Sequence, residues 1–407
     1  MRNIQSAALG AALALALAGA PAAAQDLMPA IKVGNGVTLD PILAARLRYE
    51  TVDQANLPDQ ADAVTLRVRA GIELKASGFF VLGEAEATGP IVHDYNDTIP
   101  GNGVEPFPIV ADPGNVEINR LQIGYMKNGN GVTLGRQRII LDNARFVGNV
   151  GWRQNEQTYD AVRGQAKFGQ FTLDATYSDS QRTVFGTDSP NQHYDGDFVF
   201  LNGGIDTKYL DAKAFAYLLD YDTRVAFSSN SYGVLVTGEL PIEGFGKLTG
   251  LASYAAQDDT GGNPIDYSAD YINAQFGLAF SGFTLTAGYE ELGSDHGRAA
   301  FQTPLATLHA FNGWADLFLT TPARGLRDYY GGVSKTFKVA ALPGLKFDLI
   351  YHQFDSDFGG IDYGSEWDTS LGFKLGVFNL LAKYANYEAS GFAVDTEKFW
   401  LQAEVSF

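Results

Sequence analysis

Arginine residues concentrate in one short segment of an otherwise acidic chain. Arg136, Arg138, Arg145 and Arg153 fall within eighteen residues, and Asp142 is the only acidic residue between them. A guanidinium holds a carboxylate through two parallel hydrogen bonds, and rings of arginine in a narrow pore attract anions and repel cations. These residue types at this spacing therefore indicate the binding or passage of anions.

A second set of arginines lies where polar and apolar residues alternate, or beside the first segment. Its members are Arg46, Arg48, Arg67, Arg69, Arg120 and Arg163. On the polar faces of strands that enclose a water-filled lumen, these side chains would line a pore and select anions. They could equally pair with acids on the same faces, such as Glu50, Glu73, Glu366 and Asp368. The sequence leaves pore selectivity and wall structure open, and the two roles are compatible.

The elements that would position these arginines are strands. In KFWLQAEVSF, Phe399, Leu401 and Val405 fall on one face, whereas Lys398 and Glu404 fall on the other. An unpaired charge in a dry core is too costly, so the polar face must meet water. One apolar face and one wet face suit a transmembrane barrel with an aqueous lumen.

Connection lengths separate this architecture from a soluble sandwich. The expected strands are 41–51, 63–75, 79–88, 114–126, 131–139, 155–168, 171–180, 195–206, 210–222, 230–241, 246–257, 267–280, 283–292, 326–339, 345–354, 366–377, 378–387 and 397–407. Short turns and long polar loops alternate between them, as in outer-membrane barrels with short periplasmic turns and long extracellular loops. The fold class is therefore an all-β, transmembrane antiparallel barrel of about 18 strands, with 16 as second choice, and an even count permits closure.

The N-terminal residues predict export from the cytoplasm. A basic start, a short apolar run and Ala22-Ala23-Ala24 before Gln25 are typical of a signal peptide cleaved after residue 24. Residues 25–40 would be a short periplasmic segment and 41–407 the barrel. The absence of cysteine excludes disulfides and thiolate metal sites. These features place the protein in the outer membrane of a Gram-negative bacterium.

Signals for other functions are weak. The five histidines are scattered, and nucleophile-elbow, phosphate-loop and dinucleotide-binding motifs are missing, so the sequence predicts neither an enzyme nor a cofactor. A net charge of −18 disfavours nucleic acid as a partner. Loop acids that include Asp258, Asp259, Asp355 and Asp357 could bind calcium, but solvated surface is the stronger interpretation because their spacing matches no calcium motif.

Two long segments resemble the alginate-export family of outer-membrane barrels. They are GRQRIILDNARFVGNVGWRQNEQTYDAVR, from residue 135, and TLHAFNGWADLFLTTPARGLRDYY, at 307–330. The resemblance implies an 18-stranded monomeric barrel that passes an anionic polyuronate through an arginine-lined constriction. The pore residues that it implies are Arg136, Arg138, Arg145, Arg153, Asp160, Asn312, Trp314, Asp316 and Arg327.

The chain departs from a dedicated alginate exporter in three respects. It is shorter, it lacks a periplasmic connection long enough to act as a plug, and its outer loops are acidic. The main hypothesis is nevertheless a polysaccharide exporter-like porin, and the alternative is a nutrient-uptake porin for small sugars or organic anions. A barrel enzyme, adhesin or receptor is a remote third reading. Expected partners are the solute, outer-membrane lipid and lipopolysaccharide, and the barrel-assembly machinery, which would contact the strand ending at Phe407.

Overall fold

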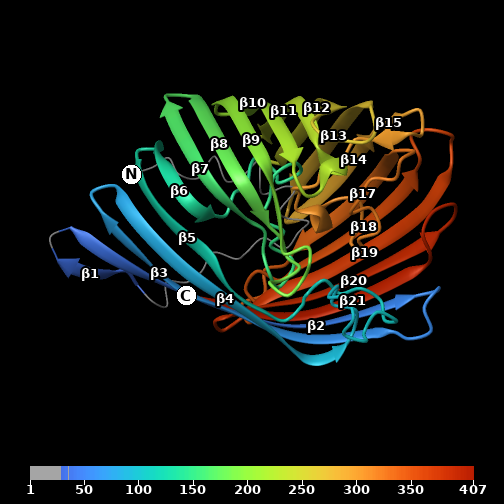
Figure 1. Cartoon of the computed structure of the whole chain (residues 1–407), viewed down its shortest axis with the longest axis horizontal. Coiled ribbons are helices and arrows are strands. Elements are labelled where there is room, and N and C mark those ends of the chain that lie inside the picture. The colour runs from blue at the N-terminus through green and yellow to red at the C-terminus, as the bar shows by residue number, and fades with distance from the viewer. Residues whose placement is uncertain (1–28, 35) are drawn as a thin grey trace.

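The strands close into one ring (Figure 1) in a computed structural model that describes residues 29–34 and 36–407. Each strand pairs antiparallel with its sequence neighbours, and β2 (Val37–Gln54) also pairs with β21 (Thr396–Ser406). The strands β2 to β14 and β17 to β21 thereby form a closed barrel of 18 strands. The predicted fold class and strand number are confirmed.

Every expected strand has a counterpart whose ends differ by a few residues. The other barrel strands are β3 (Ala61–Ala76), β4 (Phe79–Asp94), β5 (Asn115–Lys127), β6 (Asn130–Gln137), β7 (Thr158–Phe168), β8 (Phe171–Arg182), β9 (His193–Asp206), β10 (Leu210–Tyr221), β11 (Ser229–Ile242), β12 (Gly246–Asp259), β13 (Ser268–Phe280), β14 (Phe283–Leu292), β17 (Leu326–Thr336), β18 (Lys346–Asp355), β19 (Asp362–Leu375) and β20 (Phe378–Ala389). Outside the ring lie β1 (Ile31–Gly34), the β15 (Ser294–Asp295) and β16 (Ala299–Ala300) ladder, and the 3₁₀ helices η1 (Val225–Phe227) and η2 (Leu308–Ala310).

The two faces of the barrel wall differ in polarity as the alternation predicts. On β19, Trp367 is 48% exposed on the outer face, whereas Glu366 and Asp368 are buried on the inner face. On β21, Leu401 is exposed and Trp400 is fully buried. Outward apolar side chains suit hydrocarbon, and inward charged ones require the polar interior that such barrels provide.

The two rims differ in connection length. On one rim, β5 and β6 are joined by Asn128 and Gly129 alone, both with positive φ, as a tight hairpin requires. The one longer connection of that rim spans 337–345. The opposite rim carries the segments 95–114, 138–157 and 293–325. All three place buried polar side chains inside the barrel, among them Asp112, Glu156 and Asn312.

The N-terminal boundaries can be compared with the structure only in part. The predicted signal peptide, 1–24, lies outside the described residues. The first barrel strand, β2, starts at Val37, four residues before the expected strand 41–51. The boundary between a periplasmic segment and the barrel stays a prediction. Among the described residues, no helix is long and apolar enough to cross a membrane.

The outward face can be tested with two neighbours on β13. Phe276 is 73% exposed on the outer face, and Gln275 is buried on the inner face. We expect Phe276→Arg to lower the free energy of unfolding of the vesicle-inserted protein by up to about 2–4 kcal/mol, because an arginine on the lipid-facing side must leave water. Urea titration of vesicle-inserted protein, read by heat-modifiable gel mobility, measures this. A loss as large for Gln275→Arg would contradict the assigned faces.

Candidate functional site: an arginine-walled lumen

Two inward segments meet across the lumen, 138–157 and 293–325 (Figure 1). Val147 and Leu305 form an isolated parallel bridge, and the Gly148 amide donates to the Leu305 carbonyl at 2.8 Å. The Thr307 amide donates to the Ala144 carbonyl at 3.0 Å. Backbone hydrogen bonds therefore join the two segments into one partition inside the barrel.

The chain leaves the wall at a definable point. Regular pairing of β6 with β7 ends at Gln137, and beyond it Asp142, Ala144 and Val150 adopt positive φ. Left-handed conformations are costly for residues with a Cβ and persist only where the surroundings enforce them. Here the bonds between the two inward segments supply that enforcement.

One side of the lumen is basic. Arg46 on β2 lies directly opposite Arg67 on β3, a like-charge pair that is unfavourable without compensation. Arg46 donates to the carbonyls of Gly151, Trp152 and Arg153 at 3.0–3.2 Å, so the wall also holds the inward segment. The guanidinium of Arg48 lies 4.0 Å from the centre of the Trp152 ring.

The acids near this basic side form ion pairs with its arginines. Arg138 donates to Glu156 at 2.7 Å, and Arg69 bonds Glu86 and lies 3.5 Å from Glu156. Burial alone would raise the pKa of the Glu156 carboxyl, but Arg138 and Arg69 hold that pKa well below its usual range. Glu156 is therefore ionised and neutralises part of the arginine charge.

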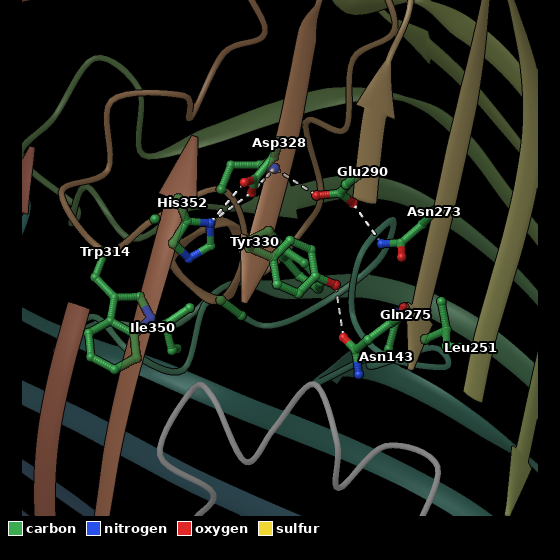
Figure 2. Close-up of a pocket in the computed structure, with 14 residues that line it drawn as sticks. Asn143, Leu251, Asn273, Gln275, Glu290, Trp314, Asp328, Tyr330, Ile350 and His352 are labelled. Carbon is green, nitrogen blue, oxygen red and sulfur yellow. Dashed lines mark hydrogen bonds and ion pairs between the residues drawn. The ribbon is translucent and has the colours of Figure 1, made fainter. Parts of the chain in front are cut away.

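The opposite side of the lumen is acidic. Glu290, Asp328, Glu366 and Asp368 are all buried on β14, β17 and β19. Their partners include donors of the inward segments: Arg145 and the Asn312 amide each reach Glu290 at 2.7 Å. The amides of Ala315 and Trp314 donate to Glu366 and Asp368 at 2.7 and 3.2 Å. Figure 2 shows His352 bonded to Asp328 beside Glu290.

A chain of polar contacts fixes segment 293–325 to the basic side. Lys383 on β20 contacts Nε2 of His309 at 2.7 Å, and Nδ1 of His309 lies 2.7 Å from Asp316. Asp316 also accepts from Lys398 at 3.2 Å and Arg153 at 3.3 Å. Burial lowers the pKa of His309 well below its usual range, which makes the ring neutral. Nε2 then accepts from the Lys383 ammonium, and Nδ1–H donates to Asp316.

Aromatic rings enclose the Lys383 ammonium. It lies 3.6 Å from the centre of the Trp314 ring, 4.2 Å from Trp152 and 5.5 Å from Trp400. The Trp152 and His309 rings stack at 4.4 Å with an interplanar angle of 6°. Cation–π attraction thus supplements hydrogen bonding for this buried cation.

Described residues line several cavities beside the partition, and two of them lie on its opposite sides. The larger, about 320 Å³, lies on the basic side and is lined by Arg46, Arg67, Arg69 and Arg138. The smaller, about 40 Å³, lies on the acidic side next to Glu290 and Asp328 (Figure 2). Asn143 and Ala310 line both cavities, so the joined inward segments separate them.

The structure brings most of the predicted residues together in the lumen. They are Arg46, Arg48, Arg67, Arg69, Arg138, Arg145, Arg153, Asn312, Trp314 and Asp316. Arg120 and Arg163 also occupy inward positions, but each pairs with a neighbouring acid, Glu84 and Asp174 respectively. Their role in the pore stays a prediction.

The structure places three predicted residues on the outer face instead. Arg136 and Asp160 are cross-strand partners that share a face with the exposed Leu134, and they pair with each other at 2.8 Å. Arg327 shares a face with the exposed Tyr329. Arg136 lies on the outer face and Arg138 in the lumen, because β6 ends between them and the two-residue period does not continue to Arg138.

Several lumen residues were not predicted from the sequence. Trp152, Glu156 and His309 lie within the two quoted segments but were not singled out, and Asp112 and Lys383 lie outside them. Lys383 could have been found, because it alternates with apolar residues along an expected strand. Among the described residues, no group of three or more His, Cys, Asp or Glu could hold a metal ion. Calcium binding by the acidic loops stays a prediction.

Comparisons with known proteins identify the family and the fold of this chain. A family model described as Gram-negative porin matches residues 10–406, and no curated protein matches the chain. OpdO of Pseudomonas aeruginosa is 16% identical with a TM-score of 0.70, covering 91% of this chain and 97% of that one. OccAB3 of Acinetobacter baumannii is 16% identical with a TM-score of 0.69, covering 91% and 99%.

A third solved structure is P. aeruginosa OpdK with vanillate, which is 13% identical with a TM-score of 0.71 and covers 91% of this chain and 98% of that one. At such identities the likenesses show the shared barrel fold. Membership of the alginate-export family is not shown by any of these matches.

The Lys383 contact should hold the partition in place. We expect Lys383→Met to weaken this attachment by about 1–3 kcal/mol, because the buried Nε2 of His309 loses its donor. Single-channel recordings should then show more frequent transient current fluctuations. Lys247→Met, at the short rim, controls for the loss of a lysine. Equal current noise in Lys383→Met and wild type would show that the contact does not restrain the segment.

Proposed function

This chain belongs to the Gram-negative porin family, and we propose that its channel selects small organic anions for passive entry. As a porin, it is an outer-membrane channel and not an enzyme. The choice of substrate rests on one observation, the cavity of about 320 Å³ that four arginines line. Its volume is at the lower end of pockets that enclose small ligands, roughly 300–1,000 Å³.

The lining of the cavity favours an anion with an apolar body. Arg46, Arg67 and Arg69 lie along one side, whereas Ile140, Trp152 and Leu381 contribute apolar surface. Guanidinium groups would hold a carboxylate, and the indole would contact a flat or aliphatic remainder. The similar barrel of OpdK was crystallised with vanillate, which is an aromatic carboxylate of this kind.

Export of an alginate-type polysaccharide is the weaker reading for this channel. A polymer needs an open path along its length, but here two hydrogen-bonded segments divide the lumen into separate cavities. Small-anion uptake, the alternative expected from the sequence, agrees better with the enclosed site. Contacts with lipopolysaccharide and with the barrel-assembly machinery stay proposals.

Current block tests the proposed function. Wild-type channels in planar bilayers should show concentration-dependent block by vanillate and much weaker block by vanillyl alcohol, which lacks the carboxylate. Block by oligouronates but not by vanillate would favour the polysaccharide reading. Channels that neither compound blocks would contradict selection by a carboxylate.

Two neighbouring arginines form a matched pair for a mutational test. Arg138 lines the cavity, whereas Arg136 lies on the outer face. We expect Arg138→Ser to reduce anion-over-cation permeability and weaken vanillate block on the order of tenfold, because one charged hydrogen-bond donor is lost and Glu156 is less neutralised. Arg136→Ser should leave both unchanged. Equal effects of the two substitutions would contradict the assigned cavity.

A further inference from the structure

One carboxylate pairs with the most buried arginine of the large cavity. Glu404 on β21 lies directly opposite Arg46 on β2, which lies directly opposite Arg67 on β3. Oε1 of Glu404 accepts from Arg67 Nη2 at 2.8 Å and from Arg46 Nη2 at 3.2 Å. The two guanidinium groups thus share a single carboxylate, which leaves an excess positive charge.

Glu404 is the more exposed member of its ion pair with Arg67. The side chain of Glu404 is 19% exposed and that of Arg67 only 2%. Both line the cavity, and Nε and Nη1 of Arg67 are buried without a hydrogen-bond partner among the described residues. An incoming carboxylate would therefore compete with Glu404 for the Nη2 donor of Arg67.

We infer that Glu404 is a resident counter-ion, which the carboxylate of a small organic anion displaces from Arg67 when it occupies the cavity. Glu404 satisfies only Nη2, whereas a free carboxylate of suitable orientation can bond Nη1 and Nη2 together. The bidentate pair compensates for the lost contact, and Arg46 remains to hold the displaced Glu404. This inference rests on the proposed function.

Competition between Glu404 and the solute keeps the affinity of the channel for its solute low. A fully exposed fork of Arg67 would hold a carboxylate tightly, but passage requires that the solute also leave. Glu404 competes with the solute for the Nη2 donor of Arg67. This competition lowers the affinity of the site for the solute, and the arginines stay in place. Glu404 is thereby a residue that sets the affinity of the site for carboxylates.

Removing the competing charge should tighten binding. We expect Glu404→Gln to lower the dissociation constant for vanillate block on the order of tenfold and to lengthen each blocking event. Glu397→Gln, the same change on the outer face of the same strand, should leave the block unchanged. A purely structural Glu404 would instead give a lower unfolding midpoint and unchanged or weaker block.

The outcomes separate this inference from the function on which it rests. Wild-type channels that vanillate does not block would overturn both. Block of the wild type that Glu404→Gln does not tighten would overturn the inference alone. If Glu404→Gln does not fold, Glu404→Asp decides, because the shorter acid competes less well for Arg67 and should also tighten block. Block no tighter than in the wild type would then overturn the inference.

Discussion

The lumen of this barrel holds many charged side chains away from bulk water, and the structure depends on how those charges are paired. Buried ions are tolerated only with partners, and breaking one such pair costs about 3–5 kcal/mol. The wall supplies only part of the pairing: Glu404 pairs with Arg46 and Arg67, but the buried acids of β14, β17 and β19 stand on other strands than the arginines of β2 and β3. The inward segments resolve this by presenting amides, Arg145 and Asn312 to the acidic side and carbonyls, Glu156 and Asp316 to the basic side.

This pairing is consistent with the proposed anion site in an otherwise acidic protein. The net charge of −18 describes the whole chain, but a solute in the cavity meets only the groups that line it. There, Arg46 and Arg67 share one carboxylate, and the ammonium of Lys383 lies behind His309. The segments that satisfy the buried charges also divide the lumen, so stability of the wall and narrowness of the pore have the same origin.

The sequence predicted the wall far better than the site. Strands could be located because lipid outside and water inside impose a two-residue period on every one of them, as on β21. Arg136 was expected inside because of the arginine cluster and the family resemblance, although the two-residue period of β6 puts it on the outer face and only Arg138, beyond the end of the strand, lines the cavity. Partners could not be predicted, because pairs such as Arg145 with Glu290 and Arg46 with Glu404 join residues 145 and 358 positions apart. Only closure of the barrel brings them together.

The ion selectivity of the unmodified channel tests this account most directly. The reversal potential of single wild-type channels, measured in planar bilayers across a potassium chloride gradient, reports whether chloride or potassium passes more readily. The arginine-lined cavity predicts a reversal potential displaced toward the chloride equilibrium potential, despite the acidic composition of the chain. A potential displaced toward that of potassium would show that the acidic loops, and not the buried arginines, govern passage.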